Sequence, residues 1–241
     1  MKPIEPDWPA PARVHAFVTT RAGGVSGGEF ASLNLGERAG DTAQNVARNR
    51  AIVREHLPAE PRWLEQVHGA HVVELGGATA PSPRADAAVT GTAREVAVVL
   101  TADCMPLFLA NRDGSRVGLA HAGWRGMASG VIENAVVALD AAPANVLAWM
   151  GPTIGPDAFE VGPEVREAFV AVDRRAEDAF RPHKPGKYMA DLYALARHRL
   201  ARAGVASVFG GGFCTYHDAE RFFSYRRVKA SGRMGAFIWI G

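Results

Sequence analysis

The sequence contains little cysteine, little net charge and no long apolar run, and each absence excludes a class of protein. Its two cysteines, Cys104 and Cys214, cannot supply the disulfide framework of a secreted scaffold. No apolar run approaches the roughly 18 residues of a membrane-spanning helix. Residues 1–11 carry four prolines and two acids rather than the apolar segment of a signal peptide. We therefore expect a cytoplasmic protein that does not bind membranes.

The charge balance argues against a nucleic-acid-binding protein. The chain has 27 Lys and Arg against 25 Asp and Glu, a formal net charge of +2, which is too close to neutral for an electrostatic footprint on nucleic acid. Hydrophobic residues make up 48% and charged residues 22%, as in ordinary globular proteins. No internal repeat or low-complexity linker divides the 241 residues. We expect residues 1–241 to form one domain, whose oligomeric state the sequence does not indicate.

Short strands and short helices alternate irregularly along the chain. The composition predicts strands at residues 13–20, 72–75, 87–90, 96–101, 106–110, 117–120, 146–150 and 235–240. Helical spacing and capping residues predict helices at residues 41–57, 127–140, 165–172 and 192–200, the last of them stopped by Gly204. Strands outnumber helices and do not alternate strictly with them. These features predict an α+β fold, a single domain of mixed β-sheets covered by helices.

Three segments place a metal-ligating side chain beside the end of a predicted strand. They are Gln66–Gly69 (QVHG), Thr101–Cys104 (TADC) and His121–Gly126 (HAGWRG). Loops at strand ends commonly hold functional groups on a rigid scaffold. The candidate ligands His68, Cys104 and His121 are too far apart in sequence to form a self-contained zinc loop. A shared site requires the fold to bring them together.

A converged set of two histidines and one cysteine has three chemical interpretations. As zinc ligands, they leave a fourth position for water or substrate, the arrangement of catalytic zinc sites. The same set suits copper, with the adjacent Met105 as a weak axial ligand. Without a metal, Cys104 acts as a nucleophile and His68 or His121 as its base. The alternative to all three is a buried structural cysteine and two unrelated histidines.

Two further segments offer sites for an anion. The glycine-rich loop at residues 19–28 presents backbone N–H groups and Arg21, although it lacks the Lys-Ser/Thr ending of a P-loop. A basic cluster, Arg226, Arg227 and Lys229, lies beside aromatic residues 222–225, so cations can hold phosphate while a ring stacks on a base. The structural alternatives are a hairpin loop and a strand edge protected by charge.

Ordered motifs over almost the whole chain resemble one family. They are Thr19–Arg21, Gly23–Ser26, Ser32–Gly36, Gly40–Asp41, Asn49–Arg50, Trp63–Leu64, Gln66–Gly69, Thr101–Cys104, His121–Gly126, Gly151–Pro152, Ile154–Pro156, Phe159–Gly162, Cys214–Thr215, Arg221–Arg227 and Gly232–Met234. The chain resembles the YfiH family, also called the laccase-domain or multicopper polyphenol oxidase-like family. Ala39 and Ser231 depart from the usual residues of the family, and neither belongs to the candidate ligand set.

The resemblance implies a fold, a ligand set and an activity. It implies a single α+β domain in which His68, Cys104 and His121 bind zinc, with copper as an alternative metal. It implies a purine nucleoside phosphorylase that uses phosphate with adenosine, inosine or methylthioadenosine, and a side activity of adenosine deaminase. Copper-dependent oxidation of polyphenols and editing of peptidoglycan precursors are the alternative activities. The sequence contains no H-x-H pair, which argues against a four-copper oxidase.

Each implied reaction needs residues beyond the metal ligands. Deamination requires a general acid/base, for which Asp103 is a candidate because it adjoins Cys104, although on a regular strand it would point away. Phosphorolysis requires a site for phosphate beside the nucleoside. The candidates for binding the anion are Arg21, Arg125, Arg226 and Arg227, and Asn34 is a candidate for contacting substrate.

Overall fold

A computed structural model describes residues 1–76 and 82–241, and a six-stranded sheet lies at its centre. In spatial order its strands are β11 (Ser207–Gly210), β7 (Val146–Met150), β5 (Met105–Asn111), β6 (Val117–Ala122), β3 (Ala87–Thr90) and β2 (Val72–Glu74). The outer strands β11 and β2 run parallel to their neighbours, whereas the inner pairs are antiparallel. The sheet is therefore mixed, as predicted.

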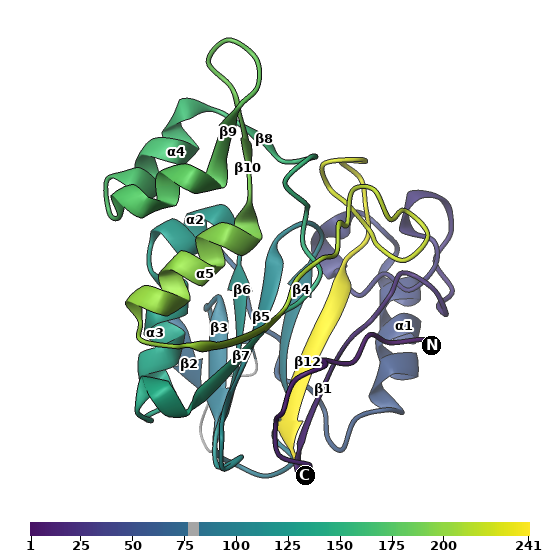
Figure 1. Ribbon diagram of the computed structural model, residues 1–241. Helices are drawn as coiled ribbons and strands as arrows, with labels where there is room; N and C mark the ends of the chain where they lie inside the picture. The colour runs from purple at the N-terminus through teal and green to yellow at the C-terminus, as the bar shows by residue number, and fades with distance from the viewer. Residues whose placement is uncertain (77–81) are drawn as a thin grey trace.

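Two smaller antiparallel sheets complete the strands of the described residues. The first has the order β1 (Val14–Val18), β12 (Met234–Ile240) and β4 (Ala97–Thr101). The second has the order β8 (Glu160–Val161), β10 (Tyr188–Ala190) and β9 (Phe180–Pro182), and in Figure 1 it projects from the top of the molecule. Each strand predicted from the sequence belongs to the six-stranded sheet or to the sheet of β1, β12 and β4.

Alternating side chains place the six-stranded sheet between two layers. On β5, Leu107 and Leu109 join the core beneath the helices, while Phe108 and Ala110 join the core shared with the three-stranded sheet. This alternation is the two-residue period of a strand that is buried on both faces. Figure 1 shows the helices of the first layer to the left of the sheet. They are α2 (Trp124–Ala128), α3 (Val131–Ala138), α4 (Pro163–Val170) and α5 (Leu192–Arg202).

The three-stranded sheet is likewise covered on both faces. On β12, Ala236 and Ile238 face the six-stranded sheet, whereas Phe237 faces a separate core with Leu33 and Val53. Val53 belongs to α1 (Ala43–Arg54), which lies on the outer side of this sheet (Figure 1). The order of layers is helices, six-stranded sheet, three-stranded sheet and helix. The predicted α+β fold, a single domain of mixed sheets covered by helices, is confirmed.

Helix ends follow the capping residues, but one predicted helix is wrong. The Thr42 hydroxyl accepts a hydrogen bond from the Asn45 N–H (3.2 Å) and starts α1 as predicted. The predicted helix at residues 127–140 is two helices, α2 and α3, because Gly130 adopts a left-handed conformation with φ of 94°. An L-residue disfavours this conformation and glycine tolerates it, so the helix breaks here.

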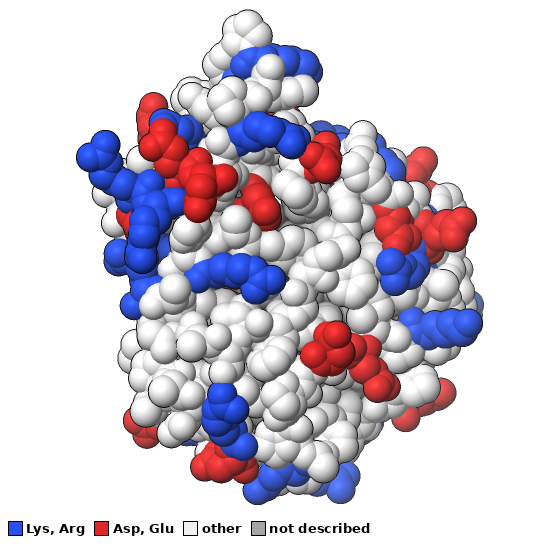
Figure 2. Space-filling view, in the orientation of Figure 1, with Lys and Arg blue, Asp and Glu red and all other residues white. Residues whose placement is uncertain are grey.

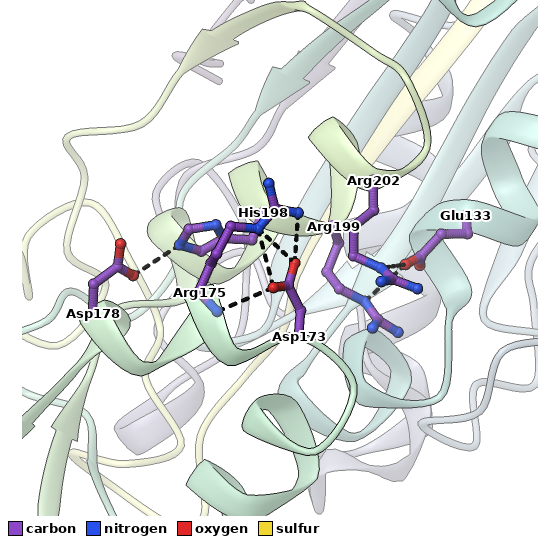
Figure 3. A network of polar contacts seen from close by, with 7 residues as sticks. All are labelled: Glu133, Asp173, Arg175, Asp178, His198, Arg199 and Arg202. Atoms are coloured by element: carbon purple, nitrogen blue, oxygen red, sulfur yellow. Dashed lines mark hydrogen bonds and ion pairs between the residues drawn. The ribbon is translucent and has the colours of Figure 1, made fainter.

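Several short elements had no recognisable pattern in the sequence. The strands β8, β9 and β10 have only two or three residues each and no marked apolar run, so no alternation could identify them. The 3-10 helices are η1 (Gly28–Phe30), η2 (Glu37–Ala39), η3 (Pro143–Asn145) and η4 (Arg174–Ala179). Figure 3 shows ion pairs that connect α5 with its neighbours, among them Arg199 with Glu133 of α3 (3.0 Å) and His198 with Asp178 of η4 (2.8 Å).

The surface mixes charges of both signs. On the face shown in Figure 2, lysine and arginine side chains lie among aspartate and glutamate side chains, in keeping with the small net charge. Within residues 1–76 and 82–241, no helix has both the length and the apolar character that a membrane span requires.

Candidate metal centre and its cavity

The fold brings the three predicted metal ligands together. Cys104 ends the turn between β4 and β5, and His121 lies on β6, where it pairs with the residue two positions after Cys104. His68 comes from the loop before β2. The ligand atoms of His68, Cys104 and His121 all lie within 4.8 Å of one another. This triad is the one such cluster of histidine, cysteine and acidic side chains that the described residues hold.

A buried carboxylate orients both histidines. Asp86 is fully buried, and its Oδ1 accepts a hydrogen bond from the backbone N–H of His68 and another from Nδ1 of His121, both at 2.9 Å. Its Oδ2 accepts from the N–H groups of Val67 and Gly69. The bond to Nδ1 leaves Nε2 of His121 as the ring nitrogen available to a metal, an arrangement common around metal-binding histidines.

The hydrogen bonds keep Asp86 ionised despite its burial. Burial raises the pKa of this carboxyl, but the hydrogen bond from His121 and those from the backbone outweigh it, so the pKa lies below its ordinary value. Sequence analysis did not select Asp86, because it stands alone before a buried strand with no motif around it. The available signal was an acid among apolar residues, which requires partners when buried.

The ligands influence one another's protonation. Burial raises the pKa of Cys104, but the positive charge of His121 and hydrogen bonds from His121 and His68 lower it to about 6. Burial lowers the pKa of His121, but Cys104 and Asp86 raise it to about 9. Cys104 is therefore a thiolate at neutral pH, and the thiolate is the form of cysteine that binds metals.

Glycine at position 123 keeps the centre open. A Cβ at Gly123 would lie 2.6 Å from Sγ of Cys104 and 3.6 Å from the His68 ring. A Cβ at Gly126 would lie 2.9 Å from the backbone oxygen of Gly69, in the loop that carries His68. The spacing of glycines in the HAGWRG segment thus follows from close packing around the ligands.

The triad opens into a cavity of about 760 Å³. This volume is typical of sites that bind small molecules. Its lining combines the ligands with aromatic side chains and a group of cations. The aromatic residues are Trp63, Trp124, Phe159 and Tyr225, and the cations are Arg38, Arg50, Arg125, Arg226, Lys229 and Arg233.

Two of the five predicted substrate-binding residues line this cavity. Arg125 lies over the ring of Trp124 (4.4 Å), and Arg226 donates a hydrogen bond to the backbone oxygen of Glu160 (2.8 Å). Both therefore have the placement that an anion-binding role requires.

The other three are not among the lining residues and support neighbouring loops. Arg21 donates to the backbone oxygens of Ala31 and Ala219. Arg227 donates to the backbone oxygens of Thr215, Tyr216 and Phe222. Asn34 is fully buried, and its Oδ1 accepts from the backbone N–H groups of Gly36 and Arg233.

Asp103 lines the cavity but does not lie on a strand. The residue adopts a left-handed conformation (φ 87°) in the turn between β4 and β5. Its carboxylate accepts hydrogen bonds from the Thr215 hydroxyl (2.6 Å) and from the backbone N–H of Arg226 (2.7 Å). The expectation that Asp103 points away along a regular strand is wrong, because the turn redirects the side chain toward the Arg226 segment.

A family model and similar proteins assign the chain to a family. Residues 15–241 match the model of the family described as multi-copper polyphenol oxidoreductase laccase. The chain belongs to this laccase-type family. The family resemblance predicted from the sequence motifs, to the YfiH proteins, is therefore confirmed.

Two named bacterial proteins and one crystal structure are similar to this chain over almost its whole length. Purine nucleoside phosphorylase YfiH of Escherichia coli is 52% identical over 241 residues, which cover 99% of each chain. A Pseudomonas aeruginosa protein, also named purine nucleoside phosphorylase, is 50% identical and covers 98% of each chain. A crystal structure of a Neisseria meningitidis protein aligns with a TM-score of 0.94 at 46% identity, covering 100% of this chain and 99% of that one.

Proposed function

We propose that the protein is a zinc-dependent purine nucleoside phosphorylase that acts on adenosine, inosine and methylthioadenosine, with adenosine deamination as a side activity. The observation that carries this proposal is the cavity, in which a metal-binding triad, aromatic walls and cations line one space. The names of the E. coli and P. aeruginosa relatives support the reaction class. Nucleosides and phosphate are small metabolites of the cytoplasm, where we place the activity.

The lining provides complementary surfaces for both substrates. Trp63, Trp124 and Phe159 offer aromatic faces on which a purine can stack. Arg125 and Arg226 are the predicted cations that line the cavity and can hold phosphate beside the ribose. Phosphorolysis joins a phosphate oxygen to C1′ as the bond to the purine breaks, so the two substrates must lie side by side. Asp103 enters this proposal as a positioning residue, because it holds the backbone of Arg226 and precedes Cys104.

The triad would hold zinc through two imidazole nitrogens and one thiolate. These donors fit the preferences of zinc, and the Asp86 carboxylate behind His121 is the usual orienting partner of such a ligand. When bound, zinc supplies a Lewis acid that polarises an oxygen or nitrogen of water or substrate. The cavity residues bind and orient the substrates around it.

Product analysis tests the proposed reaction. Zinc-loaded protein is incubated with adenosine in the presence and absence of phosphate, and the products are separated by chromatography. We expect adenine and ribose 1-phosphate only when phosphate is present, and inosine as a slower product of deamination. A Cys104→Ser variant with the same fold should lose both reactions. Absence of turnover by the zinc-loaded protein on adenosine and inosine would contradict the proposal.

Copper-dependent oxidation of phenols is the second candidate function. The donor set of two histidines and one cysteine also suits copper, and the family description refers to copper. Met105, the candidate axial ligand, lies fully buried in the apolar core below the site. Metal analysis of protein purified without added copper separates the two functions. Stoichiometric copper with phenol oxidation would favour this second candidate, and stoichiometric zinc would favour the first.

A further inference from the structure

The cations of the cavity fall into two groups. Arg38 pairs with Glu65 (3.4 Å) and Arg50 pairs with Glu37 (2.6 Å), so each of these guanidinium groups has a carboxylate partner. Four other lining cations have no ion pair with any of the described residues. They are Arg125, Arg226, Lys229 and Arg233. These four cations of the cavity wall therefore lack a directly paired carboxylate.

Arg233 has the most constrained position of the four. It lies immediately before β12, and its Nη1 donates hydrogen bonds to the backbone oxygens of Ser231 (2.5 Å) and Gly232 (3.0 Å). Its Nε and Nη2 make no hydrogen bond with any residue in the described ranges. Backbone oxygens thus fix the Nη1 end of the guanidinium. Because Arg233 lines the cavity, its Nε and Nη2 donors remain available to a bound ligand. Such a fixed fork suits an oxyanion.

The turn at Asn34–Gly36, far from Arg233 in sequence, packs against this arginine. The buried Asn34 side chain accepts the backbone N–H of Arg233 and that of Gly36, both at 2.9 Å. A Cβ at Gly36 would lie 2.7 Å from Cγ of Arg233, so a larger residue there would displace the stem of the arginine. Asn34, which the sequence predicted to contact substrate, thus contacts Arg233 instead, through the turn that it forms with Gly36.

Arg233 lies within the electric field of the metal centre. Burial lowers the pKa of Arg233, whereas the negative charges of Cys104 and Asp103 act in the opposite direction. Arginine remains protonated throughout the physiological range. A partly buried cation without a carboxylate partner is costly, and a bound anion removes that cost.

We propose that Arg233 binds the phosphate co-substrate through its free guanidinium donors, and that Asn34 and Gly36 are positioning residues that hold it in place. This inference rests on the proposed phosphorolysis and assigns its anion to a residue of the Gly232–Met234 motif that was not among the arginines predicted to bind phosphate. Phosphate presents several acceptor oxygens to paired N–H donors, and its negative charge complements the cationic wall. Because Arg233 shares the cavity with the triad, phosphate held there lies beside a nucleoside bound over the metal centre.

The test separates phosphate recognition from nucleoside recognition. For Arg233→Gln, we expect the KM for phosphate in inosine phosphorolysis to rise about 10- to 100-fold, the loss of one or two charge-assisted hydrogen bonds. The KM for inosine should change less than about threefold, and Arg233→Lys should restore part of the phosphate affinity because it retains the charge. Arg48→Gln, on the exposed side of α1, is the matched control. Equal phosphate KM values for Arg233→Gln and the control would overturn the inference.

A binding measurement makes the test independent of turnover. Titration calorimetry of the zinc-loaded protein with inorganic phosphate should show binding that Arg233→Gln loses and Arg48→Gln retains. Gly36→Ala, which keeps the arginine but crowds its stem, should weaken phosphate binding in the same direction. If the wild type binds phosphate through Arg233 but releases no purine, the proposed function fails and the anion site stands. If it releases purine with unchanged phosphate binding in both variants, the anion site fails and the function stands.

Discussion

Single residues decide how the metal centre is arranged. Asp86 contacts His121 directly and His68 through its backbone, so one carboxylate sets the direction of two ligands. Arg233 depends in the same way on Asn34, a side chain from the opposite end of the sequence. At this scale, the candidate metal ligands and the proposed phosphate-binding arginine are held by polar groups that contact only protein.

Loss of the Asp86 charge should weaken metal binding. Asp86→Asn keeps the size of the side chain but removes the ionised acceptor for Nδ1 of His121. Zinc affinity is expected to fall about 10- to 100-fold, as for other orienting partners of metal ligands. Competition with a chromogenic chelator measures this, and Asp157→Asn, an exposed acid paired with Arg181, serves as the control. Unchanged affinity would show that His121 is held without Asp86.

Zinc binding should release a proton near neutral pH. At pH 7.5 the metal-free site holds a Cys104 thiolate (pKa about 6) and a protonated His121 (pKa about 9). Because the His121 pKa is raised, its proton remains until zinc displaces it. We expect about one proton released per zinc, and affinity that rises about tenfold per pH unit between pH 7 and 8.5. Calorimetry in two buffers of different ionisation enthalpy counts the protons, and a count near zero would contradict the assignment.

The candidate ligands were predictable because reactive residues occur beside strand ends in recognisable motifs. His68, Cys104 and His121 stood out in this way, and the fold brings them together. The roles of Asp86 and Arg233 in the site were not predicted, since each role depends on contacts with segments distant in sequence. Arg227 shows the converse error, because a basic side chain in an aromatic motif binds backbone oxygens instead of lining the cavity.

At the scale of helices and strands, polar groups at the ends determine where elements begin and break. The carboxylate of Asp41 accepts hydrogen bonds from the Thr42 N–H and from the side chains of Ser26, Asn34 and Asn45. It therefore connects the start of α1 to the turn that supports Arg233. Gly130 acts differently, because its left-handed backbone separates the end of α2 from the start of α3.

Asp41 should contribute stability that depends on pH. Burial raises the pKa of Asp41, but its hydrogen bonds outweigh burial, so the pKa lies below its ordinary value. A depressed pKa stabilises the fold above the unfolded value, about 3.9, and this contribution is lost as pH falls through the folded value. Asp41→Asn should lower the free energy of unfolding by about 1–2 kcal/mol at pH 7. Urea denaturation at pH 7 and pH 3 tests this, because the difference should shrink at the lower pH.

Gly130 should resist replacement by a better helix former. Gly130→Ala places a Cβ at φ of 94°, so we expect a loss of about 1–2 kcal/mol despite the higher helix propensity of alanine. Gly27→Ala is the matched control, since its φ is −110° and no atom lies within 4 Å of the added Cβ. Denaturant unfolding measures the free energy of unfolding of both variants, and only Gly130→Ala should be destabilised. A stabilised Gly130→Ala protein would show that residues 127–140 favour one continuous helix.

Most elements were predictable from short-range patterns, and the exceptions have local causes. Apolar runs and strand composition located β5, β6 and β7, whose residues are all buried. The break at Gly130 escaped prediction because an isolated glycine inside a helical pattern is compatible with either outcome. The short strands around β10 escaped because their pairing depends on tertiary contacts.

The whole molecule is four layers deep, and the metal ligands come from three separate parts of the chain. His68, Cys104 and His121 converge only when the six-stranded sheet and the sheet of β1, β12 and β4 have formed around the turn between β4 and β5. Metal affinity is therefore linked to folding, because the unfolded chain does not hold the ligands together.

Zinc should raise the melting temperature. Free zinc at 100 times its Kd adds about 2.7 kcal/mol of stability, equivalent to a rise in Tm of about 5–11 °C for a chain of this size. A thermal scan with zinc and with a chelator measures the shift. Cys104→Ser, which removes one ligand, should reduce it, and an equal shift in that variant would place the stabilising zinc elsewhere.

The break at Gly130 divides one helical stretch into α2 and α3, which contact different parts of the molecule. The short α2 carries Trp124 and Arg125 on the cavity wall, while α3 buries Val131, Ile132 and Ala135 in the core. Because the chain changes direction at the glycine, the same stretch faces the cavity with Trp124 and Arg125 and the core with Val131, Ile132 and Ala135. A substitution at Arg125 and a substitution at Ile132 therefore alter different surfaces of one stretch of chain, the cavity wall in the first case and the core in the second.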